Sequence, residues 1–167
     1  DWREMLEKEK LDGVTVSTPD HMHAPVTMTA LKLGISPYTQ KPLTRTVHEA
    51  RAITLAAREA KIATQMGNQN HSGVNYKGLV DLVRAGLLGK IERAYAWSNR
   101  PIWPQGHQRP SGSSKIPDGL HWDLWLGVAP ERPFHKEIYH PFTWRGWYDF
   151  GAGALGDMGC HIIDPVV

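Results

Sequence analysis

The first 67 residues alternate between short β-branched or apolar segments and longer amphipathic segments. In the longer segments, apolar residues recur three and four positions apart, as they do on one face of a helix. A strand, a helix, a strand, a helix and a strand with short connections are typical of a parallel sheet with crossover helices. We therefore expect the end of a helix at residues 2–10, strands at 14–18, 35–39 and 62–66, and helices at 24–33 and 44–61.

The pattern changes after Gly67. Residues 74–88 predict an amphipathic helix, and residues 91–98 alternate in polarity, which indicates a half-exposed strand of an antiparallel sheet. Residues 100–141 have no sustained period and hold seven of the twelve prolines. A glycine-rich stretch then leads into a helix from about Leu155. The expected fold class is α/β, with a parallel-sheet domain at residues 1–67 and an α+β domain with a mostly antiparallel open sheet at residues 68–167.

Composition narrows the class of function. A net charge of +2, with 41% hydrophobic and 22% charged residues, is typical of a globular domain, and no basic cluster indicates nucleic-acid binding. No apolar stretch reaches the length of a membrane span. Cys160 is the only cysteine, which excludes an internal disulfide. The compartment stays open: the cytoplasm is favoured, and the periplasm fits if a leader precedes residue 1.

Two polar motifs follow predicted parallel strands, where open α/β sheets bind ligands. The first, TPDHMH at residues 18–23, fits either a binding loop or a polar turn with a helix cap. Its two histidines favour no metal site, because no cysteine or carboxylate lies at a supporting spacing. In the second, QKPL at residues 40–43, the backbone before Pro42 is restricted, so Lys41 can be directed over the end of the sheet. The alternative for Lys41 is a solvated surface lysine.

A third motif lies near the end of the chain. Asp157 and His161 are four residues apart, so on a helix they share one face. A carboxylate and an imidazole on one face can bind a hydroxyl group and accept its proton. The glycines around them would weaken a purely structural helix, which indicates close approach of a ligand or another backbone. The alternative is a surface ion pair, and Cys160 lies off this face, as a packing residue would.

In this order and spacing, the motifs resemble the Gfo/Idh/MocA (glucose–fructose oxidoreductase and inositol dehydrogenase) family. The resemblance covers nearly the whole chain and rests on TPDHMH, QKPL, GNQNH at 67–71, HWDLWLG at 121–127, YHPFTWRGWYDFG at 139–151 and GALGDMGCHIID at 153–164. It implies a Rossmann domain, a substrate domain, NAD or NADP as cofactor and a sugar or polyol substrate. It also implies cofactor contacts from Thr18, Pro19, His21, His23, Gln40, Lys41, Asn68 and Gln69.

The resemblance further implies a catalytic trio of Lys41, Asp157 and His161. His161 would take the hydroxyl proton as hydride leaves the sugar carbon, Lys41 would hold the reacting oxygen, and Asp157 would orient the substrate. The family usually has a glutamate where Gln40 stands, and its absence removes a negative charge beside Lys41. Two alternatives stay open: an NAD-dependent glycosidase that works by transient oxidation, and a non-catalytic chain that only self-associates.

Residues 100–141 also allow two interpretations. Sugar rings have apolar faces, so Trp103, Trp122 and Trp125 can form an aromatic wall beside the substrate. They can equally form a small separate core beneath a long loop.

The resemblance places the family's first strand and its GxGxxG turn before residue 1, and further strands of the substrate domain after Val167. On that basis we expect the isolated chain to bind NAD(P) negligibly and to be inactive, because the pyrophosphate would lack its backbone donors. We also expect a homo-oligomer, because the strand at residues 14–18 would have a bare edge. Sedimentation and a cofactor titration measure both, and a stable monomer that binds NAD at micromolar concentration would contradict them.

Overall fold

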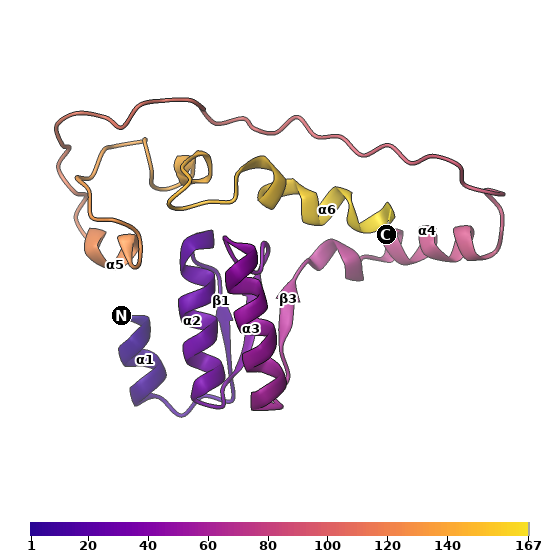
Figure 1. The fold of residues 1–167 in the computed structure, drawn as a ribbon, viewed down its shortest axis with the longest axis horizontal. Helices are drawn as coiled ribbons and strands as arrows, with labels where there is room; N and C mark the ends of the chain where they lie inside the picture. Colours follow the sequence, from indigo (N-terminus) through magenta and orange to yellow (C-terminus); the bar gives the residue numbers. More distant parts are fainter. Residues whose placement is uncertain (167) are drawn as a thin grey trace.

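A three-stranded parallel sheet in the order β1-β2-β3 is the framework of the chain, in a computed structural model that describes residues 1–166 (Figure 1). Its strands are β1 (Gly13–Val16), β2 (Ser36–Gln40) and β3 (Gln65–Gly67). The register pairs Val14 with Pro37 and Tyr38 with Gln65. The helices of this half are α1 (Trp2–Lys8), α2 (Asp20–Lys32) and α3 (Val47–Ala60). The predicted α/β fold is confirmed.

Helix α2 begins earlier than the sequence pattern predicted. It starts at Asp20, whereas the apolar spacing placed its first residue at Ala24. His21 and His23 consequently lie in the first turns of the helix, where both are buried, and not in a loop. This position determines what the two imidazole rings can contact.

Helix α3 begins later than predicted, at Val47 and not at Thr44. The Thr46 hydroxyl accepts a hydrogen bond from the Glu49 N–H at 3.2 Å, and the Glu49 carboxylate accepts one from the Thr46 N–H at 2.8 Å. This reciprocal pair satisfies backbone donors that a helix start leaves free, so it fixes the first residue of the helix. The Thr44 hydroxyl instead donates to the Thr46 carbonyl.

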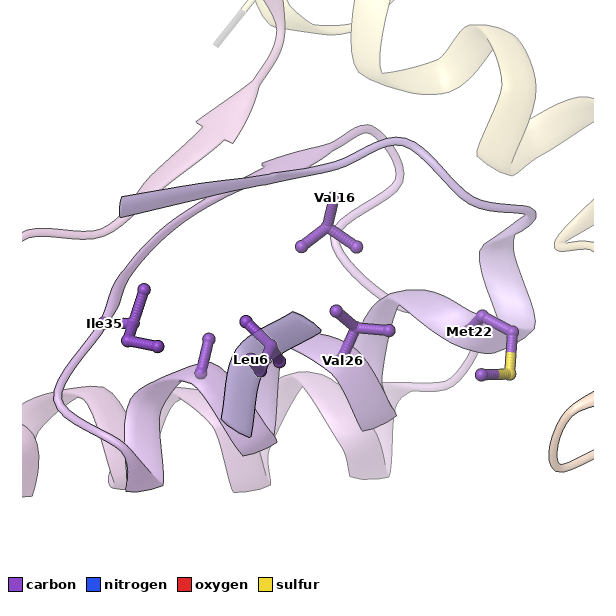
Figure 2. Close-up of a cluster of buried hydrophobic side chains, with 6 residues drawn as sticks. Leu6, Val16, Met22, Val26 and Ile35 are labelled. Atoms are coloured by element: carbon purple, nitrogen blue, oxygen red, sulfur yellow. The ribbon is translucent and has the colours of Figure 1, made fainter. Parts of the chain in front are cut away.

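The core of this half lies between the sheet and helices α1 and α2 (Figure 2). Leu6 of α1 is only 3% exposed and packs with Val16 of β1 and Val26 of α2. Met22, Ala30 and Ile35 complete the cluster. A second cluster joins α2 to α3 through buried apolar side chains, Ala24, Leu31 and Ile53.

The strand predicted at residues 91–98 is absent, and so is the antiparallel sheet: residues 68–166 contain no strand. After α4 (Val74–Arg84) the chain runs as a long extended segment (Figure 1). Tyr95 and Trp97 are 74% and 81% exposed. The alternation of polarity is present in the sequence, but a strand needs a neighbour to pair its backbone groups, and the described residues offer none here.

An aromatic cluster forms around α5 (Trp122–Leu126). The Trp122 and Trp125 rings stack with centroids 4.8 Å apart, and the Trp122 indole donates to the Arg132 carbonyl at 2.8 Å. The other buried members are Phe134, Tyr139, Trp144 and Phe150. Trp122 is a buried member of this cluster, as the interpretation as a separate core predicts, whereas Trp103 is buried outside the cluster. Neither ring is exposed, as an aromatic wall beside the substrate would require.

The last part of the chain crosses over the carboxyl ends of the strands (Figure 1). It forms one continuous helical stretch over residues 153–162, as expected from about Leu155. The middle of this stretch is the π-helical turn η3 (Leu155–Gly159), and its end is α6 (Cys160–Ile162). The short helices η1 (Gln69–Ser72) and η2 (Thr143–Gly146) lie earlier in the chain, and η4 (Asp164–Val166) follows α6. Within residues 1–166, no helix combines the length and apolarity that a membrane crossing requires.

Replacing Leu6 by alanine should lower the free energy of unfolding by about 3 kcal/mol, because it leaves a cavity between α1 and the sheet. Leu55→Ala is the matched control: Leu55 is 64% exposed, so its replacement should change stability by less than about 0.5 kcal/mol. Urea unfolding measures both. Equal shifts for the two variants would show that α1 does not pack on the sheet.

Candidate active site

A cavity of about 450 Å³ lies where the last part of the chain covers the carboxyl ends of β1 and β2. The first half contributes the loops after the two strands, and the second half contributes aromatic and charged side chains. The cavity is lined by Ser17, Thr18, Pro19, Asp20, His23, Gln40, Lys41, Pro42, Trp125, His140, Pro141, Phe142, Trp144, Arg145 and Asp157.

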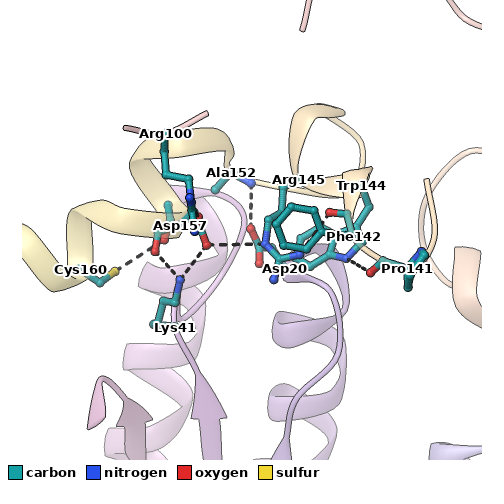
Figure 3. A network of polar contacts seen from close by, with 11 residues as sticks. Asp20, Lys41, Arg100, Pro141, Phe142, Trp144, Arg145, Ala152, Asp157 and Cys160 are labelled. Atoms are coloured by element: carbon teal, nitrogen blue, oxygen red, sulfur yellow. Dashed lines mark hydrogen bonds and ion pairs between the residues drawn. The ribbon is translucent and has the colours of Figure 1, made fainter. Parts of the chain in front are cut away.

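The Asp157 carboxylate is the centre of the polar network beside this cavity (Figure 3). The Lys41 ammonium donates to its Oδ1 at 3.1 Å and also to the Asp157 backbone carbonyl. The Arg100 Nε donates to Oδ2 at 3.1 Å, and the Arg145 Nε lies 3.6 Å from Oδ1. Three cations from distant parts of the sequence therefore meet at one carboxylate.

These cations keep Asp157 ionised. Burial raises the pKa of the Asp157 carboxyl, but the hydrogen bond and charge of Lys41, with Arg100 and Arg145, outweigh burial and leave the pKa below its usual value. The carboxylate can hold Lys41 in place and still accept a hydrogen bond from a hydroxyl group.

His161 of α6 has the properties of a proton acceptor. Burial and the charge of Lys41 lower the pKa of its imidazole, and the charges of Asp157 and Asp164 only partly oppose this. The ring is therefore neutral near pH 7 and has a free lone pair. Its Nδ1 is buried without a hydrogen-bond partner in the described residues.

Asp20 is a second buried carboxyl group at the cavity. Its Oδ2 accepts a hydrogen bond from the Ala152 N–H at 2.9 Å, which joins the start of α2 to the second half of the chain. Burial raises the pKa of Asp20, although the Ala152 bond and the charges of His23, Arg145 and Lys41 oppose the rise. Asp20 and Asp157 thus share the cavity, but their pKa values move in opposite directions.

The residues proposed for cofactor contact separate into two groups. Thr18, Pro19, His23, Gln40 and Lys41 line the cavity, and the Thr18 Oγ1 is buried without a partner. His21 does not line it.

The remaining residues of that set bind other parts of the protein. The His21 Nε2 contacts the carbonyls of Trp125 and Leu126 at 3.2 and 3.1 Å, so the ring joins α2 to the aromatic cluster. Asn68 donates to the Cys160 carbonyl at 2.7 Å. Gln69 donates to the Gln40 side chain at 2.9 Å. For His21, these contacts favour a packing role over cofactor binding.

Sequence reasoning did not single out Arg100, Arg145 or Asp20. Arg145 stands between aromatic residues in the sequence, and its guanidinium lies 4.3 and 4.5 Å from the Trp144 and Phe142 ring centroids. An arginine between aromatic residues in the sequence could have indicated a guanidinium held in place by cation–π contacts. Arg100 had no such signal, because its contact with Asp157 depends on the path of the long extended segment.

Among residues 1–166, no group of three or more histidine, cysteine, aspartate or glutamate side chains is placed to hold a metal ion. Of the three tryptophans in the aromatic-wall hypothesis, Trp125 lines the cavity and Trp103 and Trp122 do not. Trp144, which the hypothesis did not name, also lines it.

An open parallel sheet with a cavity at the carboxyl ends of its strands is the arrangement in which doubly wound α/β proteins bind ligands. Residues 1–68 match the family model described as the oxidoreductase family NAD-binding Rossmann fold, and residues 72–167 match the C-terminal α/β domain of the same family. The chain belongs to the Gfo/Idh/MocA oxidoreductase family.

Three proteins illustrate the similarity. Levoglucosan dehydrogenase of Pseudarthrobacter phenanthrenivorans is 23% identical over 98% of this chain and 34% of its own length. Alpha-N-acetylgalactosaminidase of Shewanella oneidensis is 34% identical over 56% of this chain and 21% of its own length. An inositol dehydrogenase homologue of Azotobacter vinelandii, solved with NADH and myo-inositol, has a TM-score of 0.51 at 23% identity, over 54% of this chain and 25% of that one. The chain thus spans between 21% and 34% of the length of each.

Asp157→Asn and Asp20→Asn should change stability with opposite dependence on pH. The folded-state pKa of Asp157 is lowered from 3.8, so its contribution is present above that value and is lost as pH falls through the folded value. Asp157→Asn should therefore cost about 1–2 kcal/mol at pH 7 and much less in acid.

The folded-state pKa of Asp20 is raised from 3.8, so the stability it contributes is present below that value and is lost as pH rises through the folded value. Asp20→Asn should consequently gain stability relative to wild type as pH rises. Thermal melts across pH test the pair, and parallel pH profiles for the two variants would contradict the assigned pKa directions.

Proposed function

We propose that this protein transfers hydride between a hydroxyl carbon of a sugar or polyol and NAD or NADP. The observation that carries the proposal is the Lys41–Asp157 pair at 3.1 Å, beside a cavity at the carboxyl end of a parallel sheet and close to His161. Family membership supports the reaction class, and a levoglucosan dehydrogenase among the relatives supports the substrate class.

The residues at the cavity fit the nicotinamide end of such a cofactor. Thr18, Pro19 and Gln40 line it at the ends of adjacent strands, where open α/β sheets bind dinucleotides. The unpartnered Thr18 hydroxyl can bond to a polar group of the cofactor, and Gln69 orients the Gln40 side chain through their 2.9 Å bond. When bound, the nicotinamide supplies the hydride acceptor.

Each member of the trio has a distinct task. The Lys41 ammonium donates a hydrogen bond to the reacting oxygen and stabilises the negative charge that develops there. His161 does not itself line the cavity. In the proposed reaction its neutral imidazole takes the hydroxyl proton at a ring nitrogen. The Asp157 carboxylate holds the ammonium and accepts a hydrogen bond from the substrate. Trp125 and Trp144 offer apolar surfaces to a sugar ring.

A glycosidase that uses a transient oxidation is the second candidate, because one relative is an alpha-N-acetylgalactosaminidase. The same base and the same lysine would serve both outcomes. Net formation of reduced cofactor with a free sugar identifies the dehydrogenase, whereas release of the sugar from a glycoside without net change in the cofactor identifies the glycosidase.

In a protein that carries these residues together with a complete NAD-binding domain, Lys41→Met and His161→Ala should each lower turnover of the polyol by a factor of about 10² to 10⁴, with cofactor binding close to that of wild type. Each removes a group that acts on the reacting oxygen or its proton. Formation of reduced cofactor measures turnover, and fluorescence titration measures binding. Lys32→Met, at an exposed position at the end of α2, is the matched control for Lys41 and should have no effect. Unchanged turnover in His161→Ala would refute the assignment.

A further inference from the structure

His23 connects the two loops that form one side of the cavity. Its ring is 1% exposed, yet both nitrogens face backbone oxygens. Nε2 lies 2.8 Å from the Thr18 carbonyl, and Nδ1 lies 2.7 Å from the Pro42 carbonyl. The ring therefore bridges the loop after β1 and the loop after β2.

The Pro42 carbonyl is one residue from the amine-bearing Lys41. Proline has no backbone N–H, so its carbonyl is the only backbone group through which residue 42 can be held. The Lys41 ammonium reaches Asp157 across the cavity, and this contact depends on where the Lys41 backbone lies. A hydrogen bond to the Pro42 carbonyl therefore restrains the backbone of Lys41, although the bonded group does not contact the Lys41 side chain.

Carbonyl oxygens only accept hydrogen bonds, so the His23 ring can bond to them only by donating from an N–H group. The Nδ1 contact requires a hydrogen on Nδ1. The Nε2 contact holds the end of the β1 loop and has no direct path to Lys41. Both contacts are hydrogen bonds at the same time only when both ring nitrogens carry hydrogen, and each contact has its own consequence.

We propose that His23 is a positioning residue for Lys41, acting through the bond from its Nδ1 to the Pro42 carbonyl. The inference rests on the proposed function, in which Lys41 holds the reacting oxygen. A displacement of about 1 Å in such a group costs roughly a hundredfold in rate, so the position of the Lys41 backbone controls turnover.

Two substitutions separate this role from simple packing. In His23→Asn the side-chain amide nitrogen lies near the place of Nδ1, so the Pro42 bond can be kept. In His23→Gln it lies near the place of Nε2, so the Thr18 bond can be kept and the Pro42 bond is lost. Both replacements are neutral and smaller than histidine. Asparagine leaves the larger void, so a packing role predicts that His23→Asn loses at least as much turnover as His23→Gln.

We expect His23→Asn to keep turnover within about tenfold of wild type and His23→Gln to lose roughly a hundredfold, with kcat falling more than the KM for the cofactor. The urea midpoints of the two variants should be similar. A loss of turnover in His23→Asn equal to or larger than that in His23→Gln would overturn the proposal.

Labelling of lysine amines gives a readout independent of activity. A short pulse of an acylating reagent, followed by peptide mass spectrometry, should modify Lys41 several times faster in His23→Gln than in wild type or His23→Asn. Exposed Lys32 is the internal control and should react equally in all three proteins. Equal Lys41 labelling in the two variants would contradict the positioning role.

The unmodified protein provides a test that does not depend on whether the variants fold. Imidazole ¹⁵N shifts show which ring nitrogen carries hydrogen, and the proposal requires hydrogen on the Nδ1 of His23. A ring with hydrogen on Nε2 alone would overturn it. If Lys41→Met retains full turnover, the proposed function fails instead, and the labelling comparison still decides whether His23 positions Lys41.

Discussion

The Asp157 carboxylate forms ion pairs that connect the second half of the chain to the loop after β2 of the sheet. Lys41 approaches from the loop after β2, Arg100 comes from the long extended segment after α4, and Arg145 comes from η2 in the last part of the chain. Such a carboxylate is stable in a partly buried place only if its cations are present together. The geometry of the site therefore depends on both halves at once, and neither half supplies it alone.

Three further contacts connect α2 to the second half, and all start in its first turns. Asp20 accepts from Ala152, the His21 N–H donates to the Phe150 carbonyl, and the His21 ring contacts carbonyls of α5. An α-helix leaves its first backbone N–H groups without partners inside the helix. In α2, one of these groups binds the other half of the chain. The start of α2 is consequently the joint between the sheet and the aromatic cluster.

The sequence predicted those features of the fold that depend on residues close together in the chain. The parallel sheet and its two crossover helices were predicted from periodicity. The family resemblance led to the trio Lys41, Asp157 and His161, whose roles stay a prediction. The sequence did not indicate that the His21 ring contacts α5, because a motif after a strand looks the same whether a ring faces a ligand or the core. The strand at 91–98 failed because pairing depends on a partner strand and not on alternation. Arg100 could not be placed, because its contact spans 57 positions in the sequence.

The Arg100–Asp157 contact also affects the conformational entropy of the chain. Residues 91–99 are all exposed, so little packing holds this stretch, and Arg100 is its first partly buried residue. The ion pair closes a long loop, and the entropy lost in closing it opposes the contact. The Arg100–Asp157 ion pair is therefore coupled to the order of residues 91–99. A contact that restrains these residues would increase the fraction of time for which Arg100 is paired with the Asp157 carboxylate.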